Sequence, residues 1–192
     1  MIEPIDPQVF LNDLEQQLST MAPQQQLAFG AVCTERHFPD YLTFSAMVRW
    51  GNPEPLRRAI NEAWASSAGE ARLDAGTLDK LLTECEQAAP DTEDFSTLEV
   101  SYALDVAIMA CYLVEFLRRP DPHFIVQLTS HARDLVDAKV QNAADFTPTK
   151  DDLEVAIMNH PLMREEIANL RKTLDLVRRT GRSDLAKLRN AA

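Results

Sequence analysis

The chain has 192 residues, of which 45% are hydrophobic, and it carries a net charge of −11. A chain of this length forms one domain or at most two small ones, and it can bury a hydrophobic core without disulfides. The acidic charge argues against a general nucleic-acid-binding protein, because binding to phosphates requires a basic surface.

The first part of the chain is predicted to form helices separated by prolines. Pro7 begins the first helix, and Pro23 begins a second helix that is predicted to end at about His37. Pro39 is predicted to begin a third helix, which Gly51 terminates. The segment around Pro39 is therefore interpreted as a joint between two helices.

The rest of the chain is also predicted to be helical. Asn52 and Asp121 are each followed by a proline, the pattern of an N-cap with proline at the first helical position. His160 precedes Pro161, which is predicted to break or kink the helix there, before a last long helix begins. Further helical segments are predicted at 74–88, 98–118 and 161–180, with a short C-terminal one at 183–190.

Residues 98–118 are predicted to form the central helix of the fold. The run VSYALDVAIMACYLVEFL is apolar on nearly all sides, which is typical of a helix in the middle of a bundle. Asp105 and Glu115 interrupt this run, so we interpret it as a buried core helix and not as a membrane span. Since no strand pattern, linker or repeat is present, we predict a single all-α domain over 1–192, a multi-helix bundle of about eight to nine helices around this central helix.

The sequence gives no support for a cofactor, metal or catalytic site. No glutamate is followed three residues later by a histidine, and HExxH, GxGxxG, GxxxxGK[ST] and GxSxG are missing. The three cysteines are far apart and are interpreted as small buried side chains in a reducing compartment. The N-terminus lacks the features of a secretory signal, which favours the cytoplasm.

Three charged side chains fall on apolar faces of predicted helices. Glu35 continues the inward stripe of its helix and lies in its predicted last turn, where the helix dipole disfavours an acid. Arg57 and Asp105 each lie among apolar positions. Because a buried carboxylate is costly unless it is paired, we expect Glu35 and Asp105 each to meet a cation or several hydrogen-bond donors.

The candidate partners leave two interpretations open. The cations considered are Arg57, Arg36 and Arg49, and the hydroxyl donors are Tyr41 and Tyr102. In the favoured interpretation an internal salt-bridge network fixes helix register. In the alternative, a polar pocket that binds a ligand or a partner is formed by Glu35, Arg36, Tyr41, Arg57 and Asp105. Trp50 and Trp64 are interpreted as core or interface aromatics.

The last long helix carries a narrow apolar seam with a heptad-like spacing. It consists of Met163, Ile167, Leu170, Leu174 and Val177. The seam is expected either to pack within the same bundle or to form a homodimer contact. From Arg164 onward, eight Lys or Arg residues oppose four Asp or Glu residues. This basic tail is expected to pack on the acidic body of its own chain or of a partner, and nucleic acid is a weaker option.

The chain resembles the YjaG family of bacterial proteins, a domain-of-unknown-function family. The resemblance is carried by QQLAFGAVCTERHFPDYLTFSAMVRWGNPEPLRRAINEAW at 25–64 and DTEDFSTLEVSYALDVAIMACYLVEFL at 91–117, and it extends from about Leu14 to Arg179. Its most specific parts are the Glu-Arg-x-x-Pro-x-Tyr-x-x-Phe run at 35–44, the turn at 50–52 and Trp64. Asn52 stands where the family more often has an acid, and either residue caps a helix. The resemblance implies an all-α fold and a bacterial cytosolic setting, and it implies no catalytic residue, cofactor or substrate.

The sequence therefore favours a non-catalytic protein-interaction or regulatory module, with a homodimer as one form of that interaction. The alternative is a small-molecule binder or enzyme with a polar pocket around Glu35, Arg57 and Asp105. Neither a membrane nor a nucleic-acid partner is expected.

Overall fold

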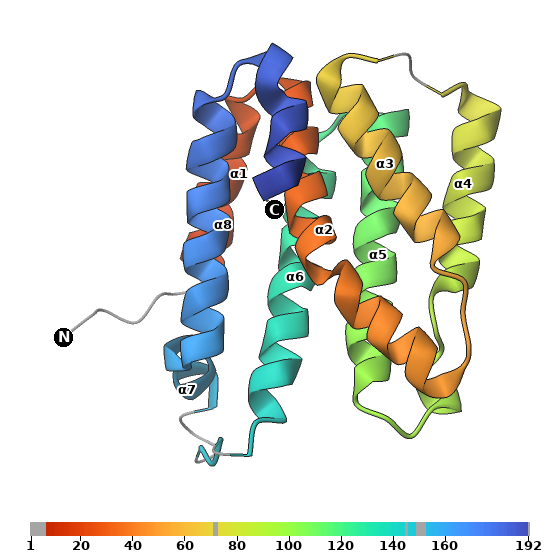
Figure 1. The fold of residues 1–192 in the computed structure, drawn as a ribbon. Helices are drawn as coiled ribbons and strands as arrows, with labels where there is room; N and C mark the ends of the chain where they lie inside the picture. The colour runs from red at the N-terminus through yellow and green to blue at the C-terminus, as the bar shows by residue number, and fades with distance from the viewer. Residues whose placement is uncertain (1–6, 71–72, 145, 149–152, 192) are drawn as a thin grey trace.

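Helices and their connections make up the computed structural model, which describes residues 7–70, 73–144, 146–148 and 153–191 (Figure 1). In chain order the elements are α1 (Pro7–Ser19), α2 (Pro23–Val48), α3 (Glu54–Ala68), α4 (Ala75–Ala88), the 3₁₀ helix η1 (Thr92–Asp94), α5 (Glu99–Arg118), α6 (Pro122–Gln141), α7 (Leu153–Asn159), α8 (Pro161–Arg179) and the 3₁₀ helix η3 (Arg182–Ala191). No strand is present in the described ranges, so the all-α prediction is confirmed.

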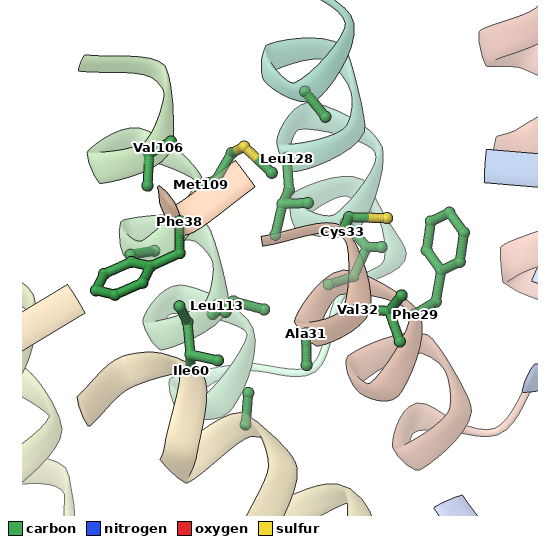
Figure 2. Close-up of a cluster of buried hydrophobic side chains, with 14 of the residues drawn as sticks. Phe29, Ala31, Val32, Cys33, Phe38, Ile60, Val106, Met109, Leu113 and Leu128 are labelled. Carbon is green, nitrogen blue, oxygen red and sulfur yellow. The ribbon is translucent and has the colours of Figure 1, made fainter. Parts of the chain in front are cut away.

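Helix α5 lies in the middle of the bundle, as predicted. It packs against α2, α3, α4 and α6, and its side chains interlock with theirs in the core (Figures 1 and 2). Figure 2 shows Phe29 of α2, Ile60 of α3, Met109 and Leu113 of α5, and Leu128 of α6 in this cluster. By length and composition alone α5 could cross a membrane, but 56% of its most apolar window is buried inside this fold.

Close packing of α2, α5 and α6 depends on a glycine. A Cβ placed on Gly30 of α2 would lie 2.9 Å from Cδ1 of Ile125 and 3.1 Å from Cδ2 of Leu113. Those separations are shorter than ordinary van der Waals contact, so a larger residue at this position would require the ends of the Ile125 and Leu113 side chains to shift within a close-packed core.

The predicted joint at Pro39 is wrong. Helix α2 runs without interruption from Pro23 to Val48, with Pro39 inside it, and it changes direction along its length (Figure 1). A proline removes one hydrogen bond and bends a helix. Here both halves of α2 bury apolar side chains, including Phe29 and Phe44, and that burial outweighs the lost bond. Glu35 therefore lies in the interior of a helix and not in its last turn.

The cap predicted at Asp121 is confirmed: its side chain accepts a hydrogen bond from the His123 amide at 3.0 Å. Asp74 caps α4 in the same way and accepts from the Thr77 amide at 3.0 Å. At α3 the N-cap is Pro53 and not the predicted Asn52, and the helix begins at Glu54. Asn52 lies one residue earlier, where its side chain accepts from the Glu54 amide at 3.1 Å.

The seam of α8 is buried within the chain. Its side chains are between 0% and 4% exposed, and α8 packs against α2, α6 and α7. The seam was expected either to pack within the bundle or to form a homodimer contact. The structure places all five of its side chains inside the bundle: Met163, Ile167, Leu170, Leu174 and Val177. A second copy of the chain cannot dock on a surface that is already covered.

The basic C-terminal segment packs on its own chain. Figure 1 shows η3 beside the first half of α2, and η3 contacts both α2 and α3. Leu185 is fully buried there. The end of the chain thus closes over the side of the α2–α3 pair.

Candidate functional site

Glu35 and Arg36 are neighbours in sequence, but they contact different parts of the bundle. Successive residues of a helix point about 100° apart. Glu35 therefore faces α3, whereas Arg36 faces α8. This divergence splits the predicted site into separate networks.

The Glu35 network joins α2, α3 and η3. Glu35 Oε1 accepts from Arg57 Nη1, and Glu35 Oε2 accepts from Trp64 Nε1 at 3.2 Å. Arg189 Nε of η3 lies 3.6 Å from the same Oε2. The expectation that Glu35 meets a cation is confirmed, and of the three arginines considered Arg57 is the one that pairs with it. The guanidinium of Arg57 also lies 4.0 Å from the centre of the Phe38 ring, a cation–π contact.

The Arg36 network is more deeply buried and joins α2, α6 and α8. Arg36 pairs with Glu166, whose side chain is only 5% exposed, and His37 Nε2 lies 3.4 Å from Glu166 Oε1. His37 Nδ1 lies 3.8 Å from Asp40, which in turn binds Lys139 at 2.8 Å. Glu166 was not among the residues predicted from sequence. Its position between Met163 and Leu170 on the apolar face of α8 was the available signal.

Burial and charge act in opposite directions on the pKa values of this network. Burial alone would raise the pKa of Glu166, but the hydrogen bond from His37 and the charges of His37 and Arg36 leave it below its usual value. Burial alone would lower the pKa of His37, but the carboxylates of Asp40 and Glu166 raise it above its usual value. Both groups are therefore held in their charged forms by one another.

Asp105 and Tyr41 lie apart from both networks. Asp105 Oδ1 is 2.8 Å from His131 Nδ1 of α6, so its partner is a histidine and none of the arginines considered from sequence. Tyr41 is fully buried and donates to the carbonyl of Ala88 at 2.7 Å, and burial raises its pKa to about 12. The five candidate residues thus do not form one pocket, because they point to different neighbours around α2 and α5.

All three cysteines are unpaired, and Cys33 and Cys85 are poorly suited to nucleophilic chemistry. Burial raises the pKa of Cys33 to about 12. Contact with Cys111 and burial raise the pKa of Cys85. Thiols of this kind are not deprotonated near neutral pH. No group of three or more potential metal ligands occurs within the part of the chain that the structure describes.

A cleft with a volume of about 790 Å³ lies between the α2–α3 turn, α3 and α4. It is lined by Trp50, Gly51, Asn52, Glu54, Pro55, Arg57, Arg58, Asn61, Glu84, Gln87 and Ala88. Arg57 alone among the five candidate residues reaches this cleft. Behind it, Glu35 holds Arg57 in place, and Arg189 binds Asn61 at 2.5 Å. The Glu35 network therefore forms the support of one cleft wall.

The turn that leads into the cleft has an unusual backbone. Arg49 has a φ of 53° and Gly51 a φ of 86°. At Gly51 a Cβ would lie 2.7 Å from the Tyr41 hydroxyl oxygen, so glycine is required both by its backbone and by the close approach. Buried Tyr41 and this glycine together fix the turn that places Trp50 at the cleft.

Trp50 and Phe95 form a partly exposed pair of rings that we call the aromatic corner. The Trp50 ring makes edge-to-face contacts with Phe95 at 5.3 Å and with buried Phe44 at 6.1 Å between ring centres. Trp50 is nevertheless 36% exposed. Met47 and Leu98, each three residues along the chain from one of the two rings, are 53% and 56% exposed. Exposed large apolar side chains are a typical feature of interaction sites.

Comparisons with known proteins establish the family and the fold. The family model described as "Protein of unknown function (DUF416)" matches residues 13–192. A crystal structure of a DUF416 family protein from Shewanella baltica OS155 is similar to this chain, with a TM-score of 0.81 and 20% sequence identity over 92% of this chain and 91% of that one. None of the curated proteins compared with it gives a match. The chain belongs to the DUF416 family, the YjaG-like proteins of unknown function that its sequence resembles.

Proposed function

We propose that this protein is a non-catalytic protein-interaction module that binds a partner segment at the aromatic corner and the adjoining cleft. The observation that carries the proposal is the state of Trp50. It is held by Phe44 and Phe95, yet it stays 36% exposed at the mouth of the cleft. Exposed and preorganised aromatic side chains at the edge of a depression are the usual anchors of protein interfaces.

The chemistry of the cleft supports binding over catalysis. Its lining contains amides, two arginines and two glutamates, but no histidine or cysteine. Arg57 is already paired with Glu35, and Arg58 lies 4.0 Å from Glu84. Glu54 is the one carboxylate of the lining without an ion pair among the described residues, and it has no nucleophile or second free acid–base group of the lining to work with, as a catalytic site would need. The amide groups and Trp50 suit recognition of a peptide instead.

The alternative is a small-molecule binder or enzyme that uses the same cleft. The volume of about 790 Å³ is within the range of ~300–1,000 Å³ common for ligand sites. The polar pocket once expected around Glu35, Arg57 and Asp105 does not support it, because Asp105 pairs with His131 on another face. The three unpaired cysteines favour a reducing, cytoplasmic location for either function.

Selection from a random peptide library displayed on phage tests the proposal. The library is selected on the full chain and on the Trp50→Ala variant in parallel. We expect peptides that are enriched on the wild-type chain and not on the variant. Leu176→Ala on α8 is the matched control, because Leu176 is 44% exposed and lies outside the corner. The proposed function would be contradicted if the same peptides were enriched on the wild-type chain and on the Trp50→Ala variant, or if no peptide were enriched.

A further inference from the structure

Four carboxylates neighbour the aromatic corner, either in the cleft or in the turn that leads to Phe95. Glu54 lines the cleft beside Trp50, and Asp91, Glu93 and Asp94 occupy the turn immediately before Phe95. All four are exposed, and none of them forms an ion pair within the described residues. Arg57 and Arg58 line the same cleft, but Arg57 pairs with Glu35 and Arg58 lies 4.0 Å from Glu84. Arg49, in the turn beside Trp50, forms no ion pair within the described residues. Among the charges that have no partner here, four carboxylates therefore stand against one arginine.

We infer that the segment bound at the aromatic corner is basic: a bulky apolar residue packs on Trp50, and flanking Lys or Arg side chains meet Glu54, Asp91, Glu93 and Asp94. The inference rests on the proposed function and adds the chemistry of the partner. An apolar anchor supplies most of the affinity of such an interface, and charge complementarity selects the partner.

Other occupants fit this surface less well. Nucleic acids and anionic membranes carry negative charge and are repelled by the same carboxylates, and the whole chain carries −11. A second copy docking corner to corner would bring the two acidic rims together, because a twofold interface pairs a patch with itself. The basic C-terminal segment of the chain is already placed on α2 and α3, where Arg189 contacts Glu35 and Asn61.

The geometry of the acidic turn suits a charge-selective rim. Asp91 accepts a hydrogen bond from the Glu93 amide at 2.9 Å, which fixes the turn, while the side chains of Glu93 and Asp94 make no hydrogen bond within the described part of the chain. The two carboxylates are thus fully available to a partner. Replacing them should change charge without disturbing the fold.

The composition of the selected peptides tests the inference. Peptides whose enrichment depends on Trp50 should carry a net positive charge and a bulky apolar residue, in excess of the unselected library. If the peptides whose enrichment depends on Trp50 are neutral or acidic, the inference of a basic partner is wrong, but the proposed function stands. If no peptide depends on Trp50, both are wrong.

Charge reversal then tests the acidic turn itself with one synthesised, enriched peptide. The Glu93→Lys/Asp94→Lys variant should bind it about tenfold more weakly at low salt, and the deficit should shrink as salt is raised. The control is Glu165→Lys/Asp175→Lys, which changes the net charge by the same amount at exposed positions of α8. Equal losses in both variants would mean that only the overall charge matters, which would overturn the inferred role of the turn.

Discussion

The seam of α8 and the aromatic corner are both groups of large apolar side chains, but the bundle covers one and leaves the other open. The five seam side chains are at most 4% exposed, whereas Trp50 of the corner is 36% exposed, and Met47 and Leu98, each three residues along the chain from Trp50 or Phe95, are 53% and 56% exposed. The regular heptad-like spacing of the seam made it the stronger interaction candidate in the sequence. In this molecule the regular apolar pattern marks a buried packing surface. The exposed apolar surface lies instead at an irregular turn.

The largest effect is expected from truncation of the seam. Leu170→Ala removes a side chain that is 1% exposed, so we expect the free energy of unfolding to fall by ~2–5 kcal/mol. Urea unfolding followed by circular dichroism measures it. A loss below ~1 kcal/mol would mean that the seam is not part of the core and would contradict the contrast between the seam and the corner.

Next in size is the buried ion pair that fixes α8 against α2. Glu166→Gln leaves Arg36 and His37 without their shared carboxylate, and we expect a loss of ~2–3 kcal/mol after allowing for the 23% exposure of Arg36. The adjacent exposed substitution Glu165→Gln is the control and should cost no more than ~0.5 kcal/mol. Equal effects of the two substitutions would contradict the described network.

Stability should also depend on pH through the same network. The pKa of His37 is raised above 6.5, so its contribution is complete below 6.5 and is lost as pH rises through the folded-state pKa. The pKa of Glu166 is lowered below 4.5, so its contribution is complete above 4.5 and is lost as pH falls through the folded-state pKa. Both contributions are thus complete between these two values.

Urea unfolding as a function of pH checks this dependence, with His37→Gln as the comparison. The variant should lose most of the decline on the alkaline side, because the raised histidine pKa causes it. An unchanged alkaline decline in His37→Gln would assign the effect to another group.

A smaller effect is expected at the support of the cleft. Glu35→Gln weakens the pairing with Arg57, and the network is partly exposed, so we expect a loss of ~1 kcal/mol. Arg57→Gln should give a similar loss, and the double variant should cost less than the sum, because both changes break one interaction. Strict additivity in urea unfolding would show that the pair is not coupled.

The smallest effect on stability is expected at the corner. Trp50→Ala should change the free energy of unfolding by no more than ~1 kcal/mol, because Trp50 is partly exposed and its neighbours Phe44 and Phe95 still contact each other at 5.0 Å. A loss as large as that of Leu170→Ala would make Trp50 a structural residue and not a docking residue.

The sequence pattern was sufficient to predict features that depend on neighbouring residues of one helix. Apolar periodicity predicted the central helix, and an acid on an apolar face predicted that Glu35 needs a cation. Pro39 could not be interpreted correctly from sequence, because the cost of a proline inside a helix is local whereas the burial that offsets it depends on α5 and α6. The contact of Asp105 with His131 depends on how α5 and α6 pair, which spacing along the chain does not reveal.

The aromatic corner shows a second limit of the sequence. Trp50 and Phe95 are 45 positions apart and meet only because the α2–α3 turn and the segment before α5 come together at one end of the bundle. The left-handed backbone at Arg49 and Gly51 decides which way Trp50 points. The turn itself was visible in sequence, but its exposure was not.

The affinity of one enriched peptide for the Trp50→Ala and Leu176→Ala variants decides whether the aromatic corner is a binding surface. Both substitutions remove a partly exposed apolar side chain, but only Trp50 belongs to the aromatic corner. We predict that the dissociation constant rises by at least about tenfold for Trp50→Ala and stays within about twofold of wild type for Leu176→Ala, with both variants folded. An unchanged dissociation constant for Trp50→Ala, or equal losses in both variants, would contradict the account.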